Sequence, residues 1–172
     1  MNTKLLKSIT VLLFICFIAN AQEANKTSYP LKADVETIDG IIKAYYEVIS
    51  GPAGEPRDWD RDVSLHHSDA LIMMTGKNKS NSPYIITQSL AEYHKSFGVP
   101  KSGFWEYEIK RKTQNFGNIT HIWSTYETKR EKDGAVTARG INSIQLYNDG
   151  ERWWILSWMF DSERKDNPLP KK

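Results

Sequence analysis

The sequence predicts an α+β domain in which helices cover one face of a curved antiparallel sheet. Helical patterns fill the first half of the chain, whereas nearly everything after Gly103 has the pattern of strands. The strongest turn signal is Asp149-Gly150, which separates two apolar-rich runs within residues 139–161 and indicates a β-hairpin. A strongly curved sheet leaves a cavity beside its helices, where a small molecule can bind.

Residues 1–21 have the pattern of a secretory signal peptide. Lys4 and Lys7 give a basic start, residues 11–18 are apolar, and Ala19-Asn20-Ala21 is a small-x-small cleavage pattern. The apolar run is shorter than the stretch that a transmembrane helix needs to span a bilayer. We therefore expect an exported protein, periplasmic or secreted, with no membrane attachment after cleavage.

Removal of residues 1–21 would change two bulk properties of the chain. It would remove Cys16, the only cysteine, so the mature chain would have no disulfide and no cysteine-ligated metal; the bulky Phe14 and Ile15 before it argue against a lipoprotein. It would also remove Lys4 and Lys7, which lowers Lys+Arg from 23 to 21 and balances the 21 Asp+Glu. A nucleic-acid partner calls for a basic face, so we expect none.

Three helices are predicted after a polar lead-in over residues 22–33. Asp34 is a plausible N-cap for a helix over residues 35–49, whose apolar residues recur at three- and four-residue spacing. A loop rich in glycine and proline covers residues 51–57. A short helix capped at Asp58 follows, through Leu65, and a third helix is predicted over residues 87–97.

Strands account for the rest of the predicted domain, which spans residues 34–163. The first covers residues 70–74 and leads into a polar loop over residues 75–83. Alternating patterns then predict strands over residues 104–114 and 119–130, followed by the two arms of the hairpin. Residues 164–172 form a polar tail with two prolines.

Six sequence motifs, which together span nearly the whole mature chain, are shared with a known superfamily. They are P-R-D-W-D-R at 56–61, H-S-D-A-L-I at 67–72, W-S-T-Y-E at 123–127, R-G-I-N-S-I-Q-L at 139–146, R-W-W-I at 152–155 and E-R-x-x-N-P-L-P at 163–170. On these motifs the chain resembles the nuclear-transport-factor-2-like (NTF2-like) superfamily, and within it the exported bacterial SnoaL-like proteins. The resemblance implies the cone-shaped NTF2-like fold, a curved antiparallel sheet packed against three N-terminal helices. It does not select a function, because this superfamily includes enzymes, binding modules and assembly domains.

One activity of this superfamily can be tested on individual residues. Its steroid isomerases carry a carboxylate base on the first strand, five residues after an Asp-Ala pair similar to Asp69-Ala70. The corresponding residue here is Met74, which cannot accept a proton. Tyr45 resembles their tyrosine donor, but a donor without its base does not make an isomerase, so we reject steroid isomerase as the specific activity.

The histidines do not have the spacing of a metal site. His66 and His67 are adjacent and point apart on a helix or strand, and neither His94 nor His121 has a histidine companion one helical turn away. We expect no metal and no organic cofactor.

General acid–base catalysis would instead need a histidine or aspartate inside the cavity. The candidates for this role are His66, His67, Asp69 and His121. The alternative for residues 67–69 is turn and cap chemistry, which serine and aspartate commonly perform.

The register of the hairpin determines which side chains face the cavity. A two- or four-residue loop at Asp149-Gly150 places Trp153 and Ile155 on the same face as Asn142, and the family pattern suggests that this face is concave. The candidate ligand-binding residues are then Tyr45, Trp59, Tyr126, Asn142, Trp153 and Ser157. For Asn142 and Tyr126 the alternative is a buried hydrogen-bond network, and for Trp59 it is ordinary core packing.

The opposite face of the hairpin would carry Trp154 and Trp158. An exposed aromatic sheet face of this size suggests a homodimer interface. A one-residue shift in the register would reverse the assignment of both faces.

Three functions remain open at this point. The favoured one is an exported domain that binds a small apolar or amphipathic molecule in its cavity. The second is a cofactor-independent acid–base enzyme of the lyase or isomerase type, and the third is a dimeric interaction domain without a ligand. A titratable group inside the cavity would favour the enzyme.

Overall fold

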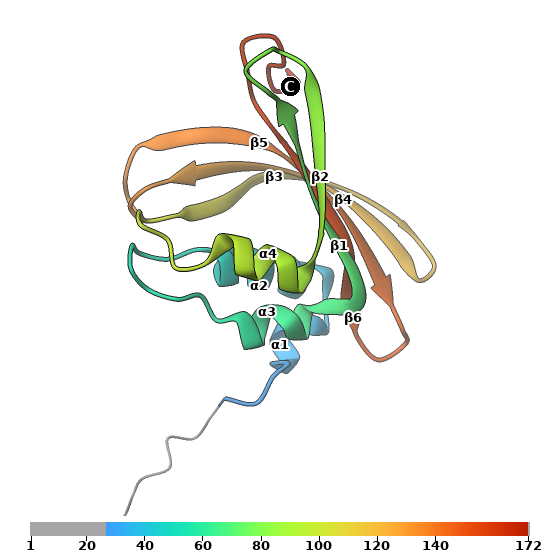
Figure 1. Cartoon of the computed structure of the whole chain (residues 1–172). Helices are drawn as coiled ribbons and strands as arrows, with labels where there is room; N and C mark the ends of the chain where they lie inside the picture. The colour runs from blue at the N-terminus through green and yellow to red at the C-terminus, as the bar shows by residue number, and fades with distance from the viewer. Residues whose placement is uncertain (1–26, 172) are drawn as a thin grey trace, which may run out of the picture.

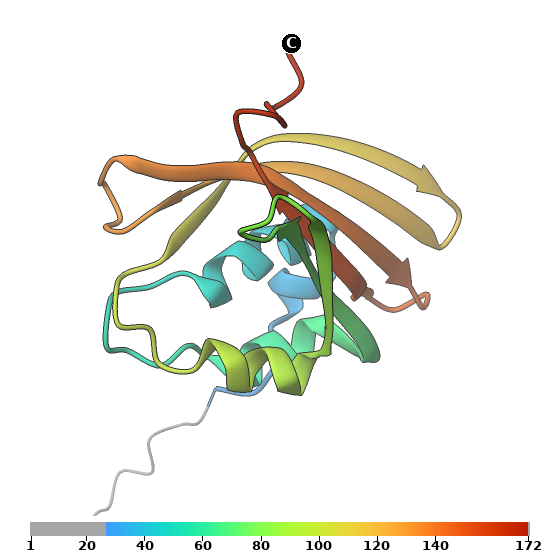
Figure 2. The same cartoon turned by 45° about the horizontal axis from the view of Figure 1, so that its top comes forward.

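A six-stranded sheet curves around short helices in the structure, a computed structural model that describes residues 27–171 (Figure 1). The predicted signal peptide, residues 1–21, lies outside the described residues. Named by their residues, the strands lie in the order 83–89, 66–77, 153–162, 136–148, 119–129 and 105–116; the second and third run parallel and all other neighbours antiparallel. This arrangement confirms the predicted α+β class, with the helices gathered on the concave face (Figure 2).

The helices are α1 (Lys32–Val35), α2 (Ile38–Ile49), α3 (Trp59–Leu65) and α4 (Leu90–Phe97). Asp58 caps α3 as predicted, because its carboxylate accepts a hydrogen bond from the backbone N–H of Arg61. Asp34 does not cap α2, which is a correction. Thr37 takes that role, and the buried Asp34 instead pairs with Arg61 at 2.8 Å.

The strands are β1 (His66–Lys77), β2 (Pro83–Ser89), β3 (Trp105–Phe116), β4 (Ile119–Lys129), β5 (Val136–Asn148) and β6 (Trp153–Ser162). β2 was not predicted, and the helix predicted from residue 87 begins only at Leu90, after the Ser89 cap. The β-branched run Ile85-Ile86-Thr87 favours an extended chain, and β1 supplies an antiparallel partner for its backbone groups. The short helical pattern was therefore overridden by strand pairing.

The predicted faces of the hairpin are correct up to Ile155 and wrong beyond it, and the predicted pairing itself is offset by two residues. Leu146 pairs with Ile155, but Gln145 pairs with Ser157, so Leu156 is an extra residue that forms a β-bulge. The bulge reverses the two faces of the strand. Trp158 therefore faces inward and is only 3% exposed, whereas Ser157 lies opposite Gln145 on the outer face.

The hydrophobic core lies between α2 and the concave face of the sheet. Ile41, Ile42 and Tyr45 of α2 are fully buried against inward-facing strand residues such as Ile144 and Ile155. Within residues 27–171 no helix is both long and apolar enough to cross a bilayer.

Candidate functional site

A cavity of about 390 Å³ lies between the concave face of the sheet and helices α2 and α4. Its wall is mainly aromatic, and the aromatic side chains that line it are Tyr45, Tyr93, Phe97, Phe104, Tyr126, Trp158 and Phe160. Polar side chains also reach the cavity from β3, β4, β5 and β6, and they are Glu106, Thr128, Arg130, Thr137, Asn142 and Ser162. The site is therefore an apolar chamber with a small number of polar groups.

Trp158 is central to the aromatic wall. Its ring meets Tyr93 edge-on with centroids 5.1 Å apart and Tyr45 at 5.7 Å, and it stacks on Phe160 at 5.9 Å. These offset and edge-to-face arrangements are the favoured geometries for aromatic rings. The inward turn of Trp158 depends on the bulge in β6, so the bulge builds this wall.

Glu106 is the buried acid of the cavity. It lies near the start of β3, is 8% exposed, and its Oε1 accepts a hydrogen bond from Asn142 Nδ2 at 2.9 Å. No other group of residues 27–171 hydrogen-bonds to this carboxyl, and none of their lysines or arginines forms a salt bridge with it. Burial raises the pKa of Glu106 to about 7, although the Asn142 hydrogen bond acts in the opposite direction.

A chain of hydrogen bonds continues from Asn142 toward the surface. Asn142 Nδ2 also donates to the Tyr46 hydroxyl at 3.1 Å, and Tyr46 lies 2.6 Å from Ser124 Oγ. Ser124 in turn donates to Glu108, which Arg111 holds in an ion pair. Because Asn142 and Ser124 are the donors at the two ends, the Tyr46 proton points toward Ser124. The chain fixes the orientation of Asn142, and Asn142 fixes that of Glu106.

Two tyrosines supply further hydroxyl groups to the cavity. The Tyr126 hydroxyl lies 3.2 Å from Ser162 Oγ, and burial raises the pKa of Tyr126 to about 12. Burial also holds the pKa of Tyr45 well above its usual range, so both groups remain neutral donors. Gly140 makes room for Tyr126, since a Cβ at Gly140 would lie 2.4 Å from the tyrosine oxygen.

Three of the predicted ligand-binding residues line the cavity, namely Tyr45, Tyr126 and Asn142. Met74 lines it as well, on the first strand, where the steroid isomerases of this superfamily carry their base.

The other three predicted ligand-binding residues do not line the cavity, which is a correction. Trp59 stacks on His94 with ring centroids 4.2 Å apart, behind the wall formed by Tyr93 and Phe97. Trp153 packs against the core near the hairpin turn, and Ser157 lies on the outer face because of the bulge.

None of the four predicted catalytic residues lines the cavity either. His66 is buried, and its Nδ1 lies 2.9 Å from the backbone oxygen of Asp62. His67 lies beside the Trp154 ring, and the exposed Asp69 donates its backbone N–H to His67. His121 lies on the outer face of the sheet next to Ser143 and Trp123. The four candidates therefore have structural roles or lie at the surface. Glu106 is the titratable cavity residue that the sequence analysis missed.

The strand pattern of β3 contained a signal for Glu106. It separates Trp105, Tyr107 and Ile109 from Glu106 and Glu108, but it does not show which set faces the cavity. The pairing of Glu108 with Tyr126 aligns the acidic set with a residue already expected inside. Alignment of the strands would therefore have placed Glu106 on the concave face.

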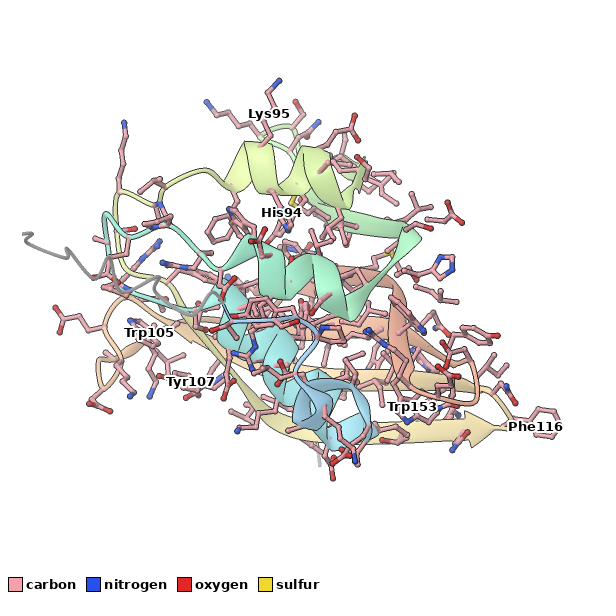
Figure 3. The ribbon with its side chains drawn as sticks, turned by 90° about the horizontal axis from the view of Figure 1, so that it is seen from below. His94, Lys95, Trp105, Tyr107, Phe116 and Trp153 are labelled. Carbon is pink, nitrogen blue, oxygen red and sulfur yellow. The ribbon has the colours of Figure 1, made fainter. Side chains whose placement is uncertain are left out.

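Another buried acid, Asp62, lies between α3 and α4, outside the cavity. Asp62 on α3 is hydrogen-bonded to His94 of α4, with 2.6 Å between Oδ2 and Nε2. His94 lies on the side of α4 that faces α3, whereas Lys95 points away (Figure 3).

In the part of the chain that the structure describes, no group of three or more histidine, cysteine, aspartate or glutamate side chains could hold a metal ion.

Solved structures with the same architecture identify the fold. A "putative ketosteroid isomerase" from Parabacteroides distasonis has a TM-score of 0.52 and 15% identity, covering 77% of this chain and 98% of that one. A protein with a cystatin-like fold from Nostoc punctiforme has a TM-score of 0.55 and 10% identity, covering 76% and 96%. The beta subunit of a "putative aromatic-ring-hydroxylating dioxygenase" from Novosphingobium aromaticivorans has a TM-score of 0.53 and 15% identity, covering 74% of this chain and 88% of that one. The chain has the NTF2-like fold. No family model and no curated protein matches the sequence.

In this NTF2-like fold the cavity occupies the space between the concave sheet face and the helices. At these low identities the similarity concerns the fold alone, so the chemistry must be argued from Glu106 and its neighbours.

Proposed function

We propose that this chain binds a small, largely apolar molecule in the cavity, with its polar group next to Glu106. The observation that carries the proposal is a buried carboxyl inside a chamber whose wall is mainly aromatic. The volume of about 390 Å³ is in the range of small-molecule pockets, roughly 300–1,000 Å³. Such pockets combine an apolar wall with a few polar groups that orient the ligand.

The energetics of Glu106 also favour a ligand. A buried polar group without a full set of partners costs roughly 1–3 kcal/mol, and a charged one costs more. A core that served only stability would gain from an apolar residue at this position. Glu106 has one hydrogen bond from residues 27–171, so a ligand that completes its hydrogen bonding would recover part of that cost.

Native mass spectrometry of protein purified from its own host tests this function, together with binding of the uncharged dye N-phenyl-1-naphthylamine. We expect a retained small molecule, or dye binding that Ala138→Trp weakens at least tenfold by narrowing the cavity at its exposed rim. Gln145→Trp, on the exposed outer face, is the matched control and should bind as the wild type does. Absence of a retained molecule, together with dye binding unaffected by Ala138→Trp, would exclude the binding function.

A second function, cofactor-independent acid–base catalysis, is favoured by the pKa of Glu106. A group with a pKa of about 7 can accept and return a proton near neutral pH. Glu106 would take a proton from a carbon next to a carbonyl, and the neutral hydroxyls of Tyr45 and Tyr126 would donate to the carbonyl oxygen. Deuterium exchange into 2-tetralone, followed by NMR, tests this. Exchange above the buffer rate that Glu106→Gln abolishes supports the enzyme, and a rate equal to that of buffer excludes it for this substrate class.

Export and dimerisation are further parts of the proposal. We expect the mature chain to begin at Gln22, which intact-mass measurement of the exported protein checks.

The outer sheet face offers a dimer surface, because Trp123 and Met159 are exposed there and Trp154 lies on the same face. Trp158 does not belong to this surface, since it is buried in the cavity wall. Analytical ultracentrifugation of the wild type and Trp123→Glu should show a dimer that the substitution weakens.

A further inference from the structure

We propose that the ligand is an organic amine whose ammonium group pairs with Glu106. The assignment rests on the proposed binding function and narrows it to one class of molecule. It is carried by the acceptor oxygens at the polar end of the cavity, by the aromatic wall, and by the lack of a resident cation near Glu106.

Beside Glu106 the cavity presents two acceptor oxygens that receive no hydrogen bond from residues 27–171. Asn142 Nδ2 uses its two protons on Glu106 and Tyr46, which leaves Asn142 Oδ1 as an acceptor. Within residues 27–171 neither Asn142 Oδ1 nor Glu106 Oε2 receives a hydrogen bond, and both side chains line the cavity. An ammonium group has three N–H donors and no acceptor, so it can donate to both oxygens at once.

The aromatic wall suits the same class of ligand. Tyr45, Tyr126 and Trp158 line the same cavity as Glu106. A cation over such rings is attracted by their electron-rich faces, and the attraction increases when water is excluded. The apolar part of an amine would occupy the remainder of the chamber near Phe97 and Phe104.

Among residues 27–171, no side-chain cation takes the place of the ammonium. The titratable groups that face Glu106 are Tyr45 and Tyr46 of α2, Tyr93 of α4 and Tyr126 of β4, and none of them carries a positive charge. Arg130 also lines the cavity, but its side chain is exposed and donates to Ser102, and it has no part in the pKa of Glu106. An anionic ligand would instead be repelled by an ionised Glu106.

Isothermal titration calorimetry with 4-phenylbutylamine and 4-phenylbutan-1-ol tests the assignment, because the two probes differ only in the terminal group. We expect the wild type to bind the amine about tenfold or more tightly than the alcohol at pH 8. Glu106→Gln should weaken amine binding about 10- to 100-fold and change alcohol binding little, since a hydrogen bond to a charged group is lost. Glu127→Gln is the matched control, because Glu127 lies on the outer face of the sheet, outside the cavity lining and paired with Lys129.

The pH dependence gives an independent readout. An ammonium pairs with the ionised form of Glu106, so its affinity should rise about tenfold between pH 6 and pH 8, as the carboxyl loses its proton. The alcohol should show no such rise. A pH dependence that Glu106→Gln removes would assign it to this carboxyl.

Two results would overturn the amine assignment. Equal affinities for amine and alcohol in the wild type would do so and leave the proposed binding function intact. Binding of neither probe would also do so, and if dye binding were then insensitive to Ala138→Trp and no molecule co-purified, the binding function would fail as well.

Discussion

Asn142 Nδ2 lies 2.9 Å from Glu106 Oε1 and 3.1 Å from the Tyr46 hydroxyl, so one amide holds a buried acid and a buried phenol at the same time. The amide donates in both directions, which stabilises the ionised form of Glu106 against the effect of burial. The balance of these two effects places the pKa of Glu106 close to neutral pH, and several measurable consequences follow from it.

Glu106 should make the stability of the protein depend on pH. Its pKa is about 7 in the folded state, against the ordinary value of 4.5, so the folded state binds the proton more tightly. The contribution of Glu106 protonation to the free energy of unfolding is therefore complete below about pH 4.5. It is lost as the pH rises through 7, by roughly 3 kcal/mol in total. Urea unfolding of the wild type and Glu106→Gln between pH 4 and pH 8 measures this. The unfolding free energy of Glu106→Gln, relative to that of the wild type, should increase with pH. A constant difference between the two proteins would contradict the raised pKa.

Asn142→Ala should destabilise the fold and raise the pKa of Glu106 further. The substitution removes the donor to both Glu106 and Tyr46, and leaving buried groups unpaired costs about 1–3 kcal/mol. Urea unfolding gives the free energy, and NMR titration of the labelled glutamate carboxyl gives the pKa. Gln145→Ala, on the outer face of the same strand, should change neither quantity. An unchanged Glu106 pKa in Asn142→Ala would refute the role of the amide.

Trp158→Ala should cost much more stability than Trp154→Ala. Trp158 is buried against Tyr45 and Tyr93, so its removal should cost about 3–5 kcal/mol. Trp154 is on the outer face, where it contacts Arg152 and Asp149, so its loss should cost about 1 kcal/mol or less. Unfolding free energies of the two variants measure the difference. Similar losses would show that the bulge at Leu156 does not divide the two tryptophans in this way.

The Asp62–His94 pair should couple α3 to α4. A double-mutant cycle with Asp62→Ala and His94→Ala is expected to give a coupling free energy of about 1–3 kcal/mol, because the pair is largely shielded from water. The exposed pair His67–Asp69 is the matched control and should couple by less than about 0.5 kcal/mol. Equal coupling in the two cycles would contradict a structural role for Asp62.

The features that were predictable from the sequence are local ones. The cap at Asp58, the strands after Gly103 and the turn at Asp149-Gly150 depend on neighbouring residues, and the structure agrees with these predictions. The inward positions of Tyr126 and Asn142 were also predictable, because alternation along a strand fixes relative faces.

The features that were missed depend on pairing between distant segments. β2 is a strand because β1 lies beside it, and Leu156 forms a bulge because β5 and β6 shift relative to each other. Neither the shift nor its effect on Trp158 can be read from the period of one strand.

By itself, the sequence determined the α+β class, the hairpin at residues 139–161 and a cavity with Tyr45, Tyr126 and Asn142 in its wall. Only the tertiary structure decided that the buried carboxyl of this cavity is Glu106 and that His66, His67, Asp69 and His121 do not line it. The physical reason is that burial and hydrogen bonding set the chemistry of a carboxyl. Both arise here from residues on β3, β5 and α2 that are far apart in the chain and meet only in the folded protein.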